Sequence, residues 1–130
     1  MVTIFKSMLF SFNTRRRLFV AFAVLSIITA IYHLIGVFYK LDESPTWRHL
    51  LFAGVCLFCT YGLLKRPKYY IYFAVLLVIQ QYYSHGVHLI NEWSVKNQVH
   101  WISVFVLLVL PIGLICLIED YKLRYGKSSE

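Results

Sequence analysis

The sequence lacks the motifs that mark several classes of membrane-bound enzyme. It contains no HExxH zinc motif and no phosphate-binding loop, and no pair of acidic residues falls inside its apolar runs. Ser84 precedes His85, but neighbouring residues on a helix point about 100° apart, so the two do not form a nucleophile and base pair. These absences disfavour hydrolase and transferase activity.

Signals for processing and lipid attachment are also missing. The sequence has no lipidation motif, no glycosylation acceptor and no small-residue cleavage site behind a short apolar core. Instead, three arginines at 15–17 precede a full-length apolar run, which is typical of a signal anchor. Within residues 1–15, the apolar side chains can share one helical face, which predicts a short N-terminal interfacial helix.

Acidic residues are scarce, whereas apolar residues are in excess. The 130 residues include 6 acidic and 13 basic ones, which gives a net charge of +7, and 59% are hydrophobic. Soluble domains are usually about 45–50% apolar. The mean hydropathy of +0.64 therefore indicates a protein whose solvent is lipid. Four runs approach the ~17–25 residues that a membrane-spanning helix needs, at about 17–39, 47–64, 69–90 and 99–118. We expect an all-α integral membrane protein, an antiparallel four-transmembrane-helix bundle that forms a single domain over residues 1–130.

The basic residues predict the orientation of this bundle. Ten of the 13 fall in the N-terminal segment, the loop between the second and third spans, and the tail at 119–130. Because short cytoplasmic loops are enriched in Lys and Arg, both termini are expected in the cytoplasm of a plasma (inner) membrane. The positive charge is then a matter of topology and anionic lipid, and we expect no nucleic-acid partner. These ten residues are Lys6, Arg15, Arg16, Arg17, Lys65, Arg66, Lys68, Lys122, Arg124 and Lys127.

Polar residues concentrate in the outer half of the third span. Gln81, His85, His88 and Glu92 are spaced i, i+4, i+7 and i+11, so they share one face of a helix. With alternating helix direction, all five histidines of the sequence fall in the outer third, and all four spans contribute. Because neutral imidazole is a common ligand of Zn and Cu, the sequence offers five candidate ligands for a metal site. These are His33, His49, His85, His88 and Glu92.

Further residues are expected to line the same outward-facing pocket. On the helical faces that carry the histidines, they are Thr29, Cys56, Gln81 and His100. Cys56 and Cys59 form a CxxC deep in the second span, where packing is the simpler interpretation and a metal or redox pair the alternative. In the fourth span, Pro111 removes one backbone hydrogen bond and frees the carbonyl of Leu107, which predicts a kink or a packing adjustment.

Three functions remain open for this polar cluster. It could be a metal- or proton-responsive site of a small channel, transporter or sensor, with Zn, Cu or Fe as the candidate metals. It could instead be a hydrogen-bond network in an accessory or assembly subunit without chemistry of its own. The third interpretation is a redox site that binds quinone or haem, for which His33 and His85 are expected at similar depths. Besides the lipid bilayer, the expected partners are further copies of the chain or a larger membrane complex.

Overall fold

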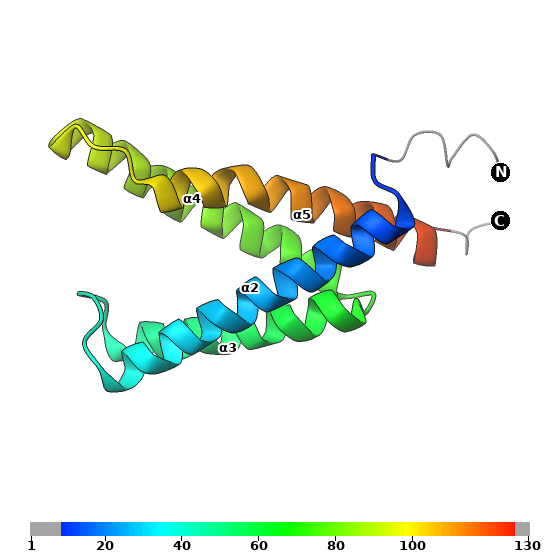
Figure 1. Cartoon of the computed structure of the whole chain (residues 1–130), viewed down its shortest axis with the longest axis horizontal. Helices are drawn as coiled ribbons and strands as arrows, with labels where there is room; N and C mark the ends of the chain where they lie inside the picture. Colours follow the sequence, from blue (N-terminus) through cyan, green and yellow to red (C-terminus); the bar gives the residue numbers. More distant parts are fainter. Residues whose placement is uncertain (1–8, 127–130) are drawn as a thin grey trace. The chain divides into compact units, whose positions relative to one another are not determined.

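The chain is helical throughout its regular structure. A computed structural model describes residues 9–126, and within this range it contains four α-helices and no strand (Figure 1). The helices are α2 (Phe12–Phe38), α3 (Thr46–Lys65), α4 (Tyr70–Lys96) and α5 (Trp101–Tyr125). Each of them overlaps one of the four runs at 17–39, 47–64, 69–90 and 99–118.

Three of these helices are long and apolar enough to cross a membrane, namely α2, α3 and α5, and they suggest a membrane location. With 27 residues, α4 is also long enough, but it is not among the candidate spans. Its composition is the reason, because the polar run that starts at Gln80 occupies its second half. The polar side chains of α4 therefore need hydrogen-bond partners from neighbouring helices more than those of the other three helices do.

The predicted N-terminal interfacial helix is not seen. Residues 1–8 of the predicted segment lie outside the described residues, residues 9–11 are not helical, and residues 12–15 already belong to α2. Ser11 is the N-cap of α2, since its hydroxyl accepts a hydrogen bond from the backbone N–H of Thr14 at 3.2 Å. At the other end of the chain, α5 continues to Tyr125, so much of the predicted tail is helical.

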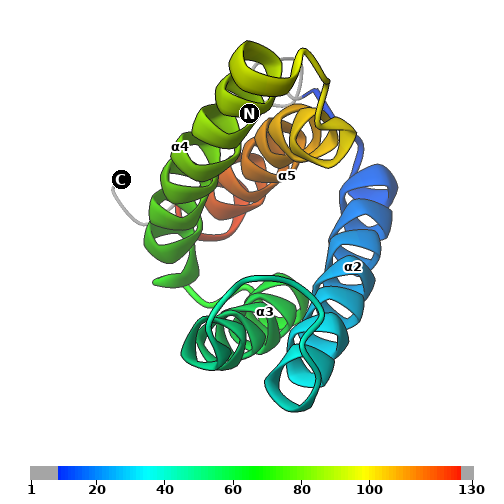
Figure 2. The same cartoon turned by 90° about the vertical axis from the view of Figure 1, so that its left-hand side faces the viewer.

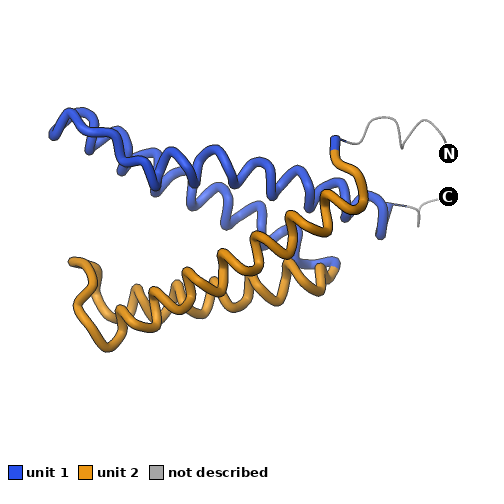
Figure 3. The backbone as a smooth tube through the Cα atoms, in the orientation of Figure 1, with its two compact units in different colours: residues 1–9, 68–130 blue, residues 10–67 orange. Residues whose placement is uncertain are grey.

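Helices α2 and α3 form one of two compact units, Phe10–Pro67 (orange in Figure 3). The two helices lie side by side (Figure 2), and small side chains on both of them are buried: Ala23, Ala30 and Ala53 are each at most 2% exposed. Small residues allow close approach of helix backbones. Arg66 ends α3 in the left-handed conformation (φ 50°), and its guanidinium carbon lies 4.8 Å from the centre of the Phe19 ring.

The other unit (blue in Figure 3) contains α4 and α5, with residues 68–126 and Leu9. Asn97, also left-handed (φ 51°), ends α4, and the chain re-enters a helix at Trp101. Pro111 lies inside α5, as its place in the fourth apolar run predicts. The Leu107 carbonyl that the proline frees accepts a hydrogen bond from the Tyr82 hydroxyl of α4. A tyrosine of the neighbouring helix thus replaces the missing backbone donor.

Candidate functional site

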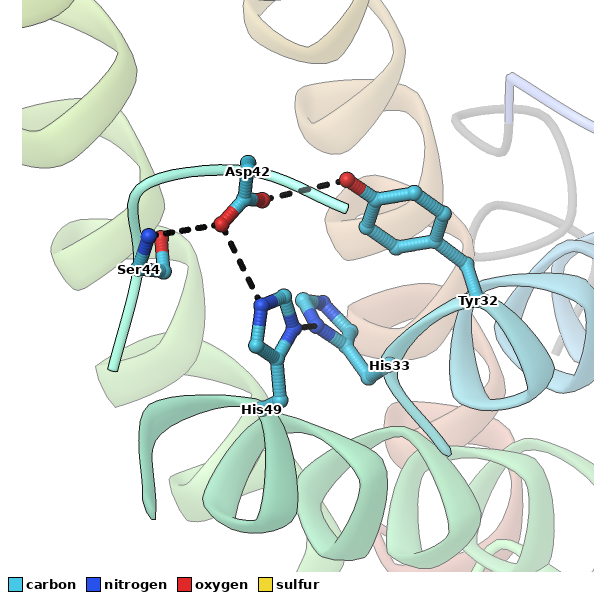
Figure 4. A network of polar contacts seen from close by, with 5 residues as sticks. All are labelled: Tyr32, His33, Asp42, Ser44 and His49. Atoms are coloured by element: carbon cyan, nitrogen blue, oxygen red, sulfur yellow. Dashed lines mark hydrogen bonds and ion pairs between the residues drawn. The ribbon is translucent and has the colours of Figure 1, made fainter. Parts of the chain in front are cut away.

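The candidate site is a chain of polar contacts at the end of the α2–α3 hairpin that carries the 39–45 loop (Figure 4). His33 of α2 and His49 of α3 meet through their Nδ1 atoms at 3.0 Å. The Nε2 atom of His49 lies 3.2 Å from Oδ1 of Asp42, which belongs to the loop. We call these three residues the Asp42–His49–His33 relay.

The loop holds the carboxylate in place from two directions. The backbone N–H of Ser44 donates to Oδ1 of Asp42 at 2.7 Å, and the hydroxyl of Tyr32 donates to Oδ2 at 3.1 Å. An aspartate that accepts a bond from the N–H two residues on forms an Asx turn, a common device of short loops. The Ser44 N–H is the main cause that lowers the pKa of Asp42 from 3.8 to about 2. The carboxylate is therefore charged throughout the neutral range.

Close packing fixes the ring of His49. This residue is only 2% exposed, and it lies against Gly36 of α2. A Cβ atom at position 36 would lie 2.6 Å from Nδ1 of His49, so the glycine is what makes room for the imidazole. The ring of His33 stacks on Phe52, with 5.4 Å between the ring centres. Neither histidine can turn freely without disturbing the neighbouring helix.

The geometry of the relay limits its protonation states. Since Asp42 is a carboxylate, His49 presents Nε2–H to it, and the neutral ring then has an acceptor at Nδ1. His33 completes the contact by donating its Nδ1–H to that acceptor, which leaves Nε2 of His33 open to a further proton. Only one hydrogen fits between the two Nδ1 atoms at 3.0 Å. The His33–His49 pair can thus gain one proton but not two.

Metal binding is not supported by this arrangement. The partners of His49 lie on its two different nitrogens, so the three relay residues form a line rather than surrounding a point. Two nitrogens on one tetrahedral zinc would be about 3.3 Å apart, given bonds of about 2.0–2.1 Å. The 3.0 Å separation fits a hydrogen bond better. No group of three or more His, Cys, Asp or Glu residues within 9–126 is placed to hold a metal ion.

The other predicted ligands lie in the α4–α5 hairpin, where they have separate partners. His85 and His100 approach the hydroxyl of Ser103 through their Nδ1 atoms, at 3.0 and 2.9 Å. The ring of His88 meets that of His100 edge-on, with 4.3 Å between the centres. Glu92 instead accepts a bond from Lys96 at 2.9 Å. The metal role predicted for His33, His49, His85, His88 and Glu92 therefore finds no common centre in either hairpin.

His100 also has a structural role at the start of α5. It is the N-cap residue, and its Nδ1 accepts a bond from the backbone N–H of Ser103 at 3.2 Å. The same nitrogen is the acceptor for the Ser103 hydroxyl, whose oxygen in turn accepts the N–H of His85. Ser103 is 0% exposed. A proton on Nδ1 of His100 would break the cap, so this cluster favours the neutral ring.

The predicted pocket-lining residues are likewise distributed over both hairpins. The hydroxyl of Thr29 donates to the Leu25 carbonyl of its own helix, and the amide of Gln81 donates to Gln80. Within residues 9–126 the cysteines Cys56, Cys59 and Cys116 form no disulfide, so the CxxC is not bridged. One pocket shared by Thr29, Cys56, Gln81 and His100 stays a prediction, and so does a haem site between His33 and His85.

Sequence reasoning missed several residues that organise the two clusters. Asp42, Gly36 and Ser103 were not among the predicted site residues, although local signals for two of them exist. Asp42-Glu43-Ser44 has the spacing of an Asx turn, and His100 precedes Ser103 by the three residues of an N-cap bond. Gly36 had no such signal, because its role depends on how α3 is rotated against α2.

Comparisons of the chain with protein-family models, with curated proteins and with solved structures give no match.

Proposed function

We propose that the protein is a proton-responsive integral membrane protein, in which the Asp42–His49–His33 relay binds one proton. The main support is the contact of 3.0 Å between the Nδ1 atoms of His33 and His49, together with the Asp42 carboxylate 3.2 Å from Nε2 of His49. A carboxylate behind an imidazole favours the charged form of the ring, and histidine is the side chain whose ordinary pKa lies near 6.5.

Proton uptake at this site breaks none of its hydrogen bonds. The added proton enters at Nε2 of His33, and the existing Nδ1–H remains shared with His49. The negative charge of Asp42 then balances the positive charge of the pair. This differs from the α4–α5 cluster, where a proton on Nδ1 of His100 would compete with the backbone N–H of Ser103.

The surroundings of the relay favour a sensor over a channel. Away from the 39–45 loop, the side chains buried between α2 and α3 include Ala23, Ala30 and Ala53, which neither donate nor accept protons. A path for ions would need polar groups along the whole span. A site confined to one end suits a protein that changes the packing of two helices when it is protonated.

The distribution of Lys and Arg favours an outer location of this site. If both termini are cytoplasmic, the 39–45 loop faces the outside of a four-span antiparallel bundle. The relay would then respond to the pH outside the cell, and the neutral helix seam would separate it from the cytoplasm.

Nitrogen-15 NMR of the full chain with labelled histidines tests the proposal, because imidazole nitrogen shifts report both tautomer and charge. Between pH 8 and 4, the His33 and His49 signals should together gain one proton. In the Asp42→Asn variant this step should shift to lower pH, whereas His88→Gln should leave it unchanged. A gain of two protons by the pair, or of none, would rule the relay out.

An accessory subunit is the second candidate, and the exposed apolar surface favours it. Only 17%, 28% and 17% of the most apolar stretches of α2, α3 and α5 are buried. Lipid or partner helices must cover the remainder. Purification in mild detergent distinguishes the two candidates: an accessory subunit should co-purify with a larger complex, whereas a sensor should keep its proton step after isolation.

A further inference from the structure

The second half of helix α4 has three polar contacts with α5, and they follow one antiparallel register. Tyr82 bonds to the Leu107 carbonyl, His85 contacts Ser103, and His88 meets the ring of His100. Successive members on α4 are three residues apart, so they lie along one face of the helix. These contacts give α5-facing partners to three polar residues in the second half of α4, Tyr82, His85 and His88. They explain how a helix with that composition can accompany α5 into a membrane.

The opposite face of α4 carries large apolar side chains that α5 does not cover. Four of them are between 41 and 75% exposed, and their spacing of three, four or seven residues places them on one continuous face. We call this face the α4 stripe. Its members are Leu76, Tyr83, Val87 and Ile90.

One polar residue interrupts this apolar face near its middle. Gln80 follows Leu76 by four residues and precedes Tyr83 by three, and its side chain is exposed. Its oxygen accepts a bond from Gln81 at 2.8 Å, but within residues 9–126 its amide nitrogen has no acceptor. An amide group that faces hydrocarbon is costly, so Gln80 needs a partner that the hairpin does not supply.

We propose that the α4 stripe is the interface between two copies of this chain, in which the amide nitrogen of Gln80 donates to the carbonyl oxygen of Gln80 in the second copy. Both copies have the same orientation in the membrane, so a two-fold axis along the membrane normal brings identical residues together. An amide carries donor and acceptor groups, and this makes Gln80 self-complementary. The stripe holds no charged residue that would call for a partner of opposite charge.

The heptad-like spacing of the stripe fits such a pairing. Apolar residues spaced three and four apart form the seam of parallel helix pairs, and a single polar residue in the seam fixes their register. A lipid tail would cover the apolar residues equally well but would leave the amide without an acceptor. The inference depends on the membrane placement of α4 and not on the Asp42–His49–His33 relay.

Energy transfer between donor- and acceptor-labelled copies of the full chain in phosphatidylcholine vesicles tests this interface. The unaltered chain should show more transfer than random proximity gives. Gln80→Leu should weaken association about tenfold, which is what two reciprocal hydrogen bonds of the strength found in membranes would account for. Gln98→Leu is the matched control: it makes the same chemical change in the exposed 97–100 connection and should leave association unaltered.

Two results would overturn the proposal: transfer in the unaltered chain no higher than random, or equal association of the Gln80→Leu variant at unchanged helix content by circular dichroism. A second measurement holds even if Gln80→Leu fails to fold. Tyr83→Cys should crosslink to itself in vesicles, beyond the background of the native cysteines. Phe105→Cys, on the exposed face of α5, should not. The reverse pattern would place the interface on α5 and contradict the proposal.

Discussion

In the α2–α3 hairpin one of two paired histidines contacts a carboxylate, whereas in the α4–α5 hairpin two of three histidines share a serine hydroxyl. His49 is 2% exposed, and its contacts lead from His33 to the charged Asp42. Ser103 is 0% exposed, and it shares its hydroxyl between His85 and His100 without any acid in contact. The number of histidines is thus a poor guide to what a cluster does.

The central partner differs between the two clusters, and the proposed proton response depends on this difference. A carboxylate stabilises an imidazolium, whereas a backbone N–H that points at Nδ1 requires the neutral ring. The α2–α3 hairpin can accordingly be charged while it keeps its contacts, and the α4–α5 cluster holds its helix together by staying neutral. Each of the following changes should affect one hairpin and leave the other intact.

The largest effect is expected for Gly36→Ala. The new Cβ would lie 2.6 Å from Nδ1 of His49, and that ring is held by bonds on both nitrogens. Overpacking of this kind costs about 1–3 kcal/mol, and the contact with His33 should be lost. Thermal unfolding in detergent, followed by circular dichroism, measures the cost.

Gly54→Ala and Gly86→Ala are the controls, one in each hairpin. Both glycines lie inside helices, and an added Cβ would meet nothing within 4 Å. Alanine is a better helix former than glycine by up to about 1 kcal/mol, so both variants should be as stable as the unaltered chain or more stable. Equal behaviour of all three variants would contradict the close packing at Gly36.

Ser103→Ala should be the next largest change, and it addresses the other hairpin. It removes the buried acceptor of the His85 N–H, and an unsatisfied buried group costs about 1–3 kcal/mol. The proton step of the Asp42–His49–His33 relay should be unaffected. The exposed Ser94→Ala provides the control, and a comparable loss of stability there would show that the effect is not specific to the cluster.

Tyr82→Phe should have a smaller effect, about 0.5–1.5 kcal/mol, through the loss of one hydrogen bond to the Leu107 carbonyl. Pro111→Ala returns a backbone donor to that carbonyl. The cost of Tyr82→Phe should therefore fall in the Pro111→Ala background, which a double-mutant cycle of unfolding free energies would detect. Additive effects would mean that Tyr82 does not compensate for the proline.

The smallest effect concerns acid stability of the 39–45 loop. Because folding lowers the pKa of Asp42 from 3.8 to about 2, its contribution to stability is complete above pH 3.8 and is lost as the pH falls towards 2. Unfolding temperatures recorded over this range should fall more steeply for the unaltered chain than for Asp42→Asn. Parallel curves would show that the hydrogen bonds to Asp42 contribute nothing.

Much of the fold follows from one-dimensional patterns in the sequence. The length of each apolar run predicts the four helices, and the missing N–H of Pro111 predicts the free carbonyl of Leu107. The donor to that carbonyl could not be predicted, because it depends on how α4 is rotated against α5. That all the histidines lie on the outer side stays a prediction, and which histidines meet depends on helix pairing, which spacing along one helix cannot supply.

The predicted metal set depends on helix pairing in the same way. Residues 85, 88 and 92 share a face in an isolated helix, and the sequence predicts that this face points at a common ion. In the folded hairpin their partners differ: Ser103 for His85, the ring of His100 for His88, and Lys96 for Glu92. Whether side chains on one face converge depends on what stands opposite each of them.

The contact of Arg66 with Phe19 joins α2 and α3 at a second place, at the end of α3 far from the contact between His33 and His49. An arginine stays charged at every pH at which the protein can work, so this contact does not depend on the protonation of His33 or His49. If the proposed proton uptake moves the two helices, we expect the largest displacement at the 39–45 loop and the smallest at the Arg66 turn.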